Sequence, residues 1–386
     1  MLSTGKTLAG EMRERLAKDQ EETVGAVDKA GPADFPGPVE ARRELAAFSG
    51  ESRSVFLLVL FGALLVVAAF TMTRGAYDIG IEDIRRVLAF RLGLGEGAGP
   101  HNALHDTIVW NLRLPRVLLA MAVGMALASA GAVFQGCFRN PLVEPYILGV
   151  SSGAAFGAAL GIVVPSFLFS VQTSAFLFAL VAVFGSYGLG RVRGETPVVT
   201  LILAGVIVGS IFSALVSVLK YVAHDTALRE IVFWLMGGFY YTTWRDVLVV
   251  SPVVLACFVW QWSLSWKLNV LSMGDEEARA LGVHPEKYKM ALIVLATLST
   301  SVSVSTVGIV AWVGLMMPHA TRMMIGPDHR FVLPASAMLG GIYLLVCDTL
   351  ARTLTTAEIP IGILTSLLGA PYLFYLLRAK GSFITG

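Results

Sequence analysis

Ten long apolar segments recur along this chain, and they constrain its fold more than any other feature. They lie at residues 55–71, 117–134, 146–164, 172–189, 198–221, 247–262, 290–304, 306–317, 334–346 and 361–377. A helix needs about 20 predominantly apolar residues to cross a bilayer, because the hydrocarbon core is about 30 Å thick. With 55% apolar and only 15% charged residues, the 386-residue chain has more apolar surface than a water-soluble core can bury. The pattern predicts an all-α, polytopic membrane protein with about ten transmembrane helices.

Prolines inside or beside the apolar segments predict that several of these helices are short or broken. The prolines are Pro141, Pro145, Pro165, Pro318, Pro360 and Pro371. A membrane tolerates broken helices only where protein or a water-filled cavity satisfies the freed backbone groups. Such helices are typical of a transporter and not of a simple anchor. The stretch 290–317 can be counted as one span or as two.

Basic residues occur in alternate loops, which predicts the orientation. They are Arg191, Arg193, Arg279, Lys287, Arg322, Arg330, Arg378 and Lys380. Positively charged loops stay in the cytoplasm, and an even number of spans brings both termini to that side. Loops 74–111 and 224–245 then lie outside, where the Trp and Tyr residues of the second loop suit a membrane interface. We expect a multi-pass protein of the bacterial cytoplasmic (inner) membrane with both termini cytoplasmic.

Residues 1–53 form a separate polar segment before the transmembrane domain, which we place at residues 54–380. It carries ten acidic and eight basic residues, and breakers cluster at residues 31–38. We interpret it as a cytoplasmic arm, partly helical at residues 11–22 and otherwise disordered. The late start of the first apolar run argues against a cleaved secretory signal.

Catalytic and metal-binding patterns are missing from the sequence. Cys137, Cys257 and Cys347 sit in apolar runs, where they are expected to be small buried hydrophobes. His319 follows Pro318 at the end of a span, which favours a packing role over a ligand role. Since no zinc pattern, nucleophile motif or phosphate loop is present, we predict that the chain is not an enzyme and binds no metal or cofactor of its own.

Small residues repeat at every fourth position in two segments. The first set is Gly149, Gly153, Gly157 and Gly161, and the second is Gly205, Gly209, Ser213 and Ser217. Helices in lipid associate through such residues, so both sets predict helix-packing faces. The alternative is that they line a pathway smoothed for a bulky substrate.

The loop at residues 272–289 is the most informative polar segment. Its composition predicts a short helix from Asp275 to Leu281 that is broken at Gly282 and Pro285. An amphipathic elbow of this kind could project from the membrane and fit a groove in a partner protein. The alternative is an ordinary solvated connector.

Many ordered motifs resemble one known family. The first group is Arg113-Leu-Pro-Arg116, Gln135-Gly, Arg139-Asn-Pro-Leu142, Glu144-Pro145 and Leu148-Gly-Val-Ser-Ser-Gly153. The second group is Leu203-Ala-Gly205, Trp234-Leu-Met-Gly-Gly238, Ala278-Arg-Ala-Leu-Gly282, Gly314-Leu-Met-Met-Pro-His319, Gly326-Pro-Asp-His-Arg330, Pro360-Ile-Gly362 and Gly369-Ala-Pro371. In order and spacing they resemble the FecCD-type permeases of ABC importers for iron siderophores, haem and cobalamin. The resemblance covers residues 55–380, and the N-terminal arm is longer than this family leads us to expect.

The resemblance implies a transport function with a defined set of partners. In this family the permease pairs with a second copy of itself, two cytoplasmic ATPases bind ATP and Mg, and an extracytoplasmic binding protein delivers the chelate. It implies that residues 272–289 are the coupling elbow that contacts the ATPase. The residues placed there are Gly274, Asp275, Glu276, Ala278, Arg279, Leu281 and Gly282.

The resemblance also implies that Arg113, Arg116 and Arg352 meet acidic residues of the binding protein. Judged without it, these arginines could instead extend to lipid headgroups, or Arg352 could pair with Asp348 on one helix face.

Two other classes of function remain open from the residues alone. An ion-gradient-driven secondary transporter would keep an intramembrane carboxylate, for which Glu144 is the only candidate, at a cytoplasmic turn. A membrane-bound sensor or scaffold would not need so many spans. No residue pattern identifies the transported chelate.

Overall fold

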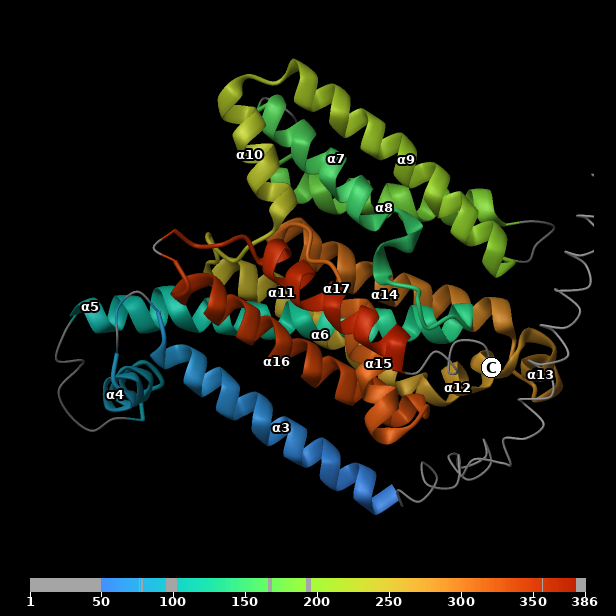
Figure 1. The fold of residues 1–386 in the computed structure, drawn as a ribbon, viewed down its shortest axis with the longest axis horizontal. Coiled ribbons are helices and arrows are strands. Elements are labelled where there is room, and N and C mark those ends of the chain that lie inside the picture. Colours follow the sequence, from blue (N-terminus) through green and yellow to red (C-terminus); the bar gives the residue numbers. More distant parts are fainter. Residues whose placement is uncertain are drawn as a thin grey trace, which may run out of the picture. The chain divides into compact units, whose positions relative to one another are not determined.

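The computed structural model describes residues 50–379, with gaps at 76, 78, 95–102, 166–168, 192–195 and 356. These residues form helices and turns, with no strand among them, which confirms the predicted all-α class (Figure 1). Most of the predicted N-terminal arm, including the helix expected at residues 11–22, lies outside the described residues. The first described helix, α3, begins at Gly50.

Each of the ten predicted apolar segments overlaps mainly with a different helix. The helices are α3 (Gly50–Thr73), α6 (Leu114–Phe138), α7 (Val150–Val163), α8 (Val171–Gly190), α9 (Val198–Val222), α11 (Trp244–Ser263), α14 (Pro285–Val307), α15 (Val313–Ile325), α16 (His329–Thr353) and α17 (Ile361–Ala379). Seven helical spans in the described part of the chain are long and apolar enough to cross a membrane, and two shorter helices are also apolar. The chain is therefore a multi-pass membrane protein.

The connections between the long helices contain shorter helical elements. They are α4 (Ile81–Arg91), α5 (Ala103–Asp106), a π-helical segment (Thr107–Arg113) that leads into α6, a 3-10 turn (Pro145–Leu148), α10 (Asp225–Met236), α12 (Ser265–Met273) and α13 (Asp275–Ala280), of which the sequence predicted only α13 as a short helix. Helical connections satisfy their own backbone hydrogen bonds, which is an advantage next to lipid.

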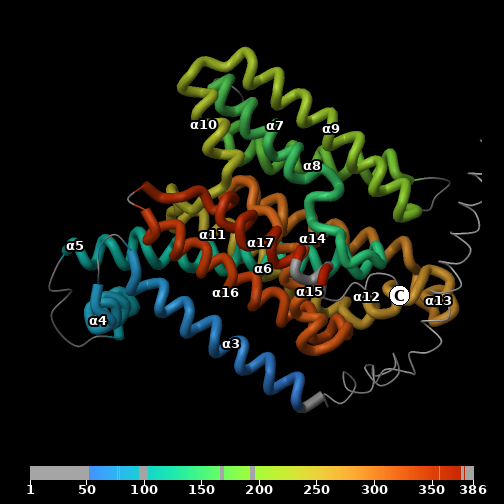
Figure 2. The backbone as a smooth tube through the Cα atoms, viewed as in Figure 1, coloured from blue at the N-terminus to red at the C-terminus, as the bar shows by residue number. Residues whose placement is uncertain are grey.

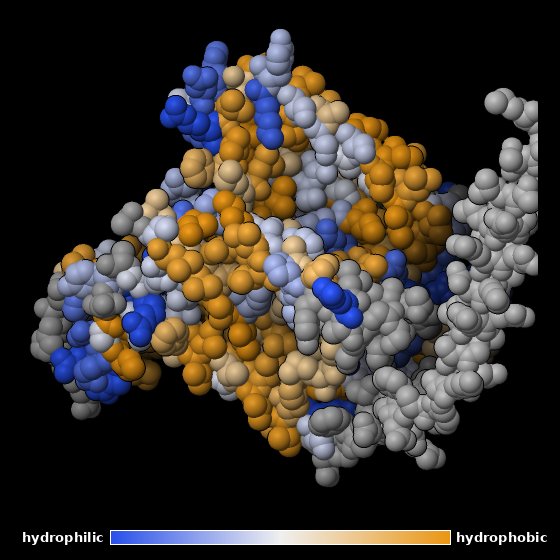
Figure 3. All heavy atoms as spheres, in the orientation of Figure 1, coloured by the Kyte–Doolittle hydropathy of each residue, from blue (hydrophilic) through white to orange (hydrophobic). Residues whose placement is uncertain are grey.

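Helix α6 lies at the centre of the described bundle. It packs against α16, α14, α11 and α15, and 83% of the most apolar window of its span is buried (Figure 2). The spans of α3 and α9 are only 22% buried in the same measure, and their apolar side chains cover the surface (Figure 3). Because these outer faces are apolar and unburied, they are suited to face lipid.

The stretch 290–317 contains two helices, of which only α14 is long and apolar enough to cross a membrane. Helix α14 ends at Val307, and α15 begins at Val313. Between them Gly308 has φ of 76° and Trp312 has φ of 74°. A Cβ atom on Gly308 would lie 2.2 Å from the carbonyl oxygen of Trp234, so this break requires glycine.

Candidate functional site

Two pockets lie at opposite ends of the antiparallel helices α6 and α16. Each helix has 25 residues, which corresponds to a length of about 37 Å at 1.5 Å per residue. The arginine pocket contains the start of α6 and the end of α16. It is lined by Gly75, Tyr77, Ile108, Leu112, Arg113, Arg116, Phe239, Tyr240, Thr242, Arg352, Thr353, Leu354, Thr355 and Glu358.

The second pocket, the His329 pocket, contains the end of α6 and the start of α16. It is lined by Arg53, Gln135, Gly136, Arg139, Asn140, Pro141, Asn269, Ser272, Met273, Arg322, Pro327, Asp328 and His329. The two pockets are thus separated by nearly the length of a membrane-spanning helix.

A network of buried charges organises the arginine pocket. The guanidinium of Arg116 donates to Asp348 Oδ1 at 2.8 Å and pairs with Glu358 Oε2 at 2.9 Å. Asp348 is fully buried and also pairs with Nε of Arg352 at 3.1 Å. Because a buried carboxylate requires compensation of its charge, Asp348 holds both guanidinium groups in place.

Backbone carbonyls accept further hydrogen bonds from two arginines of the pocket. Arg113 donates to the carbonyl oxygens of Met72, at 2.7 Å, and of Tyr77. Arg352 donates to the carbonyl oxygens of Arg74, at 3.0 Å, and of Thr71, at 3.3 Å. These contacts join the end of α3 and the residues after it to the start of α6 and to the end of α16.

The structure therefore brings the three predicted docking arginines together in one pocket. Their side chains are more buried than those of ordinary rim residues, since Arg113 and Arg116 are 5% and 9% exposed. The pairing of Arg352 with Asp348, which was the alternative to docking, is present. A role in docking stays a prediction, and sequence reasoning did not identify Glu358 as a partner of Arg116.

Tyr240 contributes a protonated hydroxyl to the arginine pocket. Burial, reinforced by the negative charge of Glu358, raises the pKa of Tyr240 to about 12. The phenol therefore stays neutral at physiological pH and adds no negative charge beside the arginines.

The predicted coupling segment forms the short helix α13, which is followed by Gly282 at φ of 75°. Asp275 accepts a hydrogen bond from the buried ammonium of Lys289 at 2.6 Å, so the segment is tied to α14. Ser272 and Met273, which directly precede the segment, line the His329 pocket. The segment therefore lies at the opposite end of the α6 and α16 pair from the arginine pocket.

Only part of the coupling segment is available to a partner. Glu276, Arg279, Leu281 and Gly282 are exposed, Asp275 is half-buried, and Gly274 and Ala278 are buried. Ala278 is 0% exposed, whereas Leu281 is 56% exposed. Any partner surface would therefore contact Leu281 and not Ala278.

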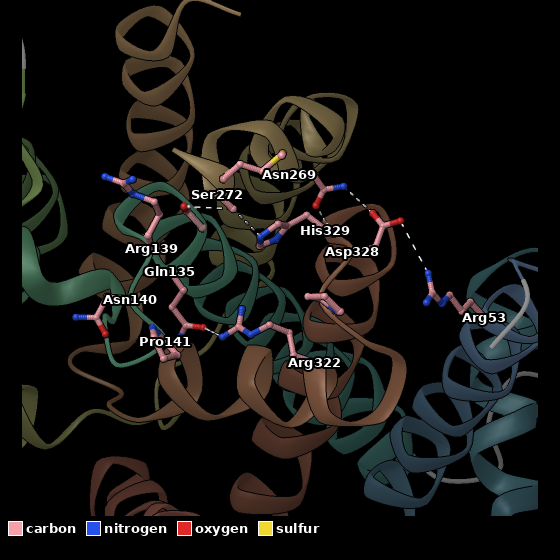
Figure 4. Close-up of a pocket in the computed structure, with 13 residues that line it drawn as sticks. Arg53, Gln135, Arg139, Asn140, Pro141, Asn269, Ser272, Arg322, Asp328 and His329 are labelled. Carbon is pink, nitrogen blue, oxygen red and sulfur yellow. Dashed lines mark hydrogen bonds and ion pairs between the residues drawn. The ribbon is translucent and has the colours of Figure 1, made fainter. Parts of the chain in front are cut away.

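Polar side chains bind the elements around the His329 pocket together. The amide nitrogen of Gln135 donates to the carbonyl oxygens of Val143, Gly314 and Leu315 at 3.1 to 3.3 Å. Its amide oxygen accepts a hydrogen bond from Arg322, which extends toward it from α15 (Figure 4). One buried side chain thus links α6, the loop after it and α15.

Asp328 caps helix α16 at the same pocket. It accepts hydrogen bonds from Asn269 at 2.7 Å and from the backbone nitrogen of Arg330 at 3.0 Å. Burial alone would raise the pKa of Asp328, but the hydrogen bonds from Arg330 and Asn269 outweigh this effect and lower the pKa to about 2. Asp328 is therefore ionised at physiological pH.

Most glycines of the two repeated sets lie where helices approach closely. A Cβ atom on Gly153 or Gly157 would lie 2.4 Å or 2.2 Å from a carbonyl oxygen of α8, and one on Gly205 would lie 2.1 Å from that of Ile147. A Cβ atom on Gly161 would lie 3.0 Å from Cα of Val171. These distances support the packing role that the spacing predicted.

Gly149 and Gly209 differ from the other glycines of the two sets. Gly149 has φ of 81° and begins α7, so its backbone conformation favours glycine. A Cβ atom on Gly209 would meet its nearest atom, Oγ of Ser152, at 3.6 Å. Gly209 therefore has room for a side chain.

Glu144, the carboxylate considered for ion coupling, lies in the loop between α6 and α7. Burial raises its pKa, an effect that a backbone hydrogen bond from Trp312 partly offsets. The three cysteines are buried and free, as expected for small hydrophobes.

Comparisons with known proteins assign a family to this arrangement. A family model described as the FecCD transport family matches residues 49–379. The cobalamin import system permease protein BtuC of Halobacterium salinarum is 44% identical over 276 residues, which cover 71% of this chain and 74% of that protein. The molybdate import system permease protein MolB of Haemophilus influenzae is 38% identical over 330 residues, which cover 84% of this chain and 97% of that protein.

A solved structure agrees with these matches. It is described as a metal-chelate type ABC transporter in an inward-facing conformation, and it matches with a TM-score of 0.74 at 37% identity. The match covers 85% of this chain and 99% of that chain. The similarity therefore extends over nearly the whole of the solved chain.

Proposed function

This chain belongs to the FecCD transport family, and we propose that it is the transmembrane permease subunit of an ATP-driven importer for a metal chelate. One observation carries the proposal: the arginine pocket and the coupling segment lie at opposite ends of α6 and α16. An importer needs one face that receives cargo and another that receives mechanical work. We assign the first role to the arginine pocket and the second to the coupling segment.

The arginine pocket is the proposed docking face for an extracytoplasmic binding protein. Arg113, Arg116 and Arg352 supply three positive charges, of which Asp348 and Glu358 compensate two. Glu358 is 38% exposed in its side chain, so an acidic residue of a binding protein could replace it on Arg116. Electrostatic complementarity of this kind guides association and fixes register.

The coupling segment is the proposed contact for a cytoplasmic ATPase. When the ATPase subunits close on ATP and Mg, they would displace α13. The ion pair between Asp275 and Lys289 passes this displacement to α14, and α12 passes it to α6. A tilt of these helices would alternate access to a pathway between this chain and a second copy of itself.

The proposed cargo is a chelated metal: a ferric siderophore, haem or cobalamin. The cobalamin relative and the metal-chelate type structure support this class. The molybdate relative extends the range of cargo among similar permeases to an oxyanion. We place the chain in a bacterial cytoplasmic (inner) membrane with both termini cytoplasmic, because the basic loops then face inward.

A secondary transporter is the competing proposal, and the charges give it less support. The described carboxylate that is most deeply buried in a span, Asp348, is already paired with Arg116 and Arg352. A coupling carboxylate must instead be free to exchange its ion.

The test reconstitutes the protein with the ATPase and the binding protein encoded beside it. Binding of the loaded binding protein is measured by surface plasmon resonance across a salt series. We expect Arg116→Gln to slow association, most strongly at low ionic strength, and Glu358→Gln to speed it. Equal association rates for both variants and the wild type would contradict the docking role, while absence of any ATPase complex would contradict the importer itself.

A further inference from the structure

The His329 pocket has properties of a ligand site that neither docking nor coupling explains. Its volume is about 520 Å³, within the range of about 300 to 1,000 Å³ that is usual for small-molecule pockets. Three arginines line it, Arg53, Arg139 and Arg322, against one carboxylate, Asp328. The pocket therefore has a net positive charge.

Arg322 lacks an anionic partner within the described part of the chain. Its guanidinium donates to the neutral amide oxygen of Gln135, and no ion pair joins it to any described carboxylate. Figure 4 shows the side chain extending into the middle of the pocket. A guanidinium has five N–H donors in a planar fork that matches an oxyanion, so several of these donors are available.

Asp328 cannot neutralise the pocket, because other groups already occupy its oxygens. Arg330 contacts both oxygens at 2.7 to 3.1 Å, and Asn269 donates at 2.7 Å. The nearest contact from Arg53 is 4.0 Å long. The charges of Arg53, Arg139 and Arg322 are therefore largely uncompensated.

Two buried polar atoms of the same pocket have no hydrogen-bond partner among the described residues. They are Nε of Arg53 and Nδ1 of His329, and His329 is 95% buried, with 5% of its surface exposed. The other ring nitrogen of His329 contacts Oγ of Ser272 at 3.3 Å. Because buried polar atoms are normally hydrogen-bonded, these two atoms are suited to contact a ligand that enters the pocket.

We propose that the His329 pocket binds a phosphate-class oxyanion, with Arg322 as its main ligand and Arg139 and Arg53 at its edges. Bidentate hydrogen bonds from a guanidinium match the spacing of phosphate oxygens. The pocket lies at one end of membrane-spanning helices, so the phosphate could belong to an anionic lipid headgroup or be free in solution. Both sources present the same chemistry to Arg322.

The experiment uses the purified full chain without any partner, so that its outcome is independent of transport. Binding of inorganic phosphate is measured by calorimetry in phosphate-free detergent buffer. Native mass spectrometry then measures lipid retention after extraction from nanodiscs that contain phosphatidylcholine and phosphatidylglycerol. The variants are Arg322→Gln and Arg139→Asn, since Asn tolerates the left-handed conformation of Arg139 at φ of 52°.

Lys267→Gln is the matched control, because Lys267 lies in α12 beside the pocket but does not line it. We expect saturable phosphate binding, selective retention of phosphatidylglycerol, or both, reduced about tenfold in Arg322→Gln. Arg139→Asn should weaken binding severalfold, and Lys267→Gln should not change it. Phosphate binding alone identifies a soluble anion, and lipid retention alone identifies a headgroup.

If the wild type shows neither saturable phosphate binding nor selective retention of phosphatidylglycerol, the proposal is overturned. Equal losses in Arg139→Asn and Lys267→Gln would also overturn it, because only general charge would then matter. If Arg322→Gln does not fold, as judged from its melting curve, the comparison of the other two variants decides the question.

Discussion

Arg116 and Asp348 form a hydrogen bond of 2.8 Å between α6 and α16, although 232 residues separate them in the chain. Asp348 is fully buried and pairs with Arg352 through its second oxygen. The charged side chains of α6 and α16 therefore depend on one carboxylate. The pocket proposed for docking is held in shape by the same contact.

Replacement of this carboxylate should destabilise the protein strongly. Asp348→Asn leaves two buried guanidinium groups without an adequate counterion, for which we expect a loss of about 3 to 5 kcal/mol. Glu358→Gln is the control, because Glu358 is partly exposed and its pair should contribute about 1 kcal/mol or less. Melting temperatures in detergent report both effects. Equal melting temperatures for the two variants would show that Asp348 does not hold the network.

The close approach of α7 and α8 should make Gly157 intolerant of a side chain. A Cβ atom there would lie 2.2 Å from the carbonyl oxygen of Ser174, so Gly157→Ala should cost about 1 to 3 kcal/mol through overpacking. Gly185→Ala on α8 is the matched control, since nothing lies within 4 Å of its Cβ position. Thermal unfolding of both variants tests the packing role. Loss of transport in Gly157→Ala at unchanged stability would favour the pathway role instead.

Leu281 should be the more informative residue of the coupling segment. It is exposed, so Leu281→Asp should prevent recruitment of the ATPase while the permease still inserts and folds. Ala278→Asp is a different experiment, because Ala278 is buried and a carboxylate there would disrupt α13 itself. Co-purification of the ATPase, together with the melting temperature of the permease, distinguishes the two effects. A full complex with Leu281→Asp would show that this residue is not at the interface.

Asp328 should contribute to stability over a defined pH range. Its pKa is lowered from 3.8 to about 2 in the folded protein, so its stabilising effect is complete above the unfolded value and is lost as the pH falls through the folded value. The difference in melting temperature between wild type and Asp328→Asn should therefore be constant from pH 8 to about pH 5. It should shrink only in stronger acid. A difference that falls between pH 8 and pH 6 would contradict the assignment.

The membrane-spanning helices could be predicted from sequence because length and apolar composition alone determine whether a helix can cross lipid. The segment from Asp275 to Gly282 was also predictable, since its cap and breaker residues act locally. The two-helix nature of 290–317 was not, because it depends on the contact between Gly308 and the backbone of Trp234. Such a contact joins distant parts of the chain.

The same limit explains what was missed in the pockets. Glu358 lies 242 residues from Arg116, and one sequence contains no information about which distant charges meet. Gln135 belongs to a recognised motif, yet its hydrogen bonds to Gly314 and Leu315 appear only in the fold. The burial of Ala278 beside the exposed Leu281 likewise depends on how α13 packs.

Uptake by proteoliposomes decides whether this permease imports a metal chelate at the expense of ATP. The protein is reconstituted with the ATPase and binding protein encoded beside it, and entry of labelled ferric siderophore, haem and cobalamin is measured with and without ATP on the ATPase side. We expect uptake of one of these chelates that requires ATP and is lost in Leu281→Asp. Uptake that proceeds without the ATPase and follows an imposed ion gradient would contradict this expectation.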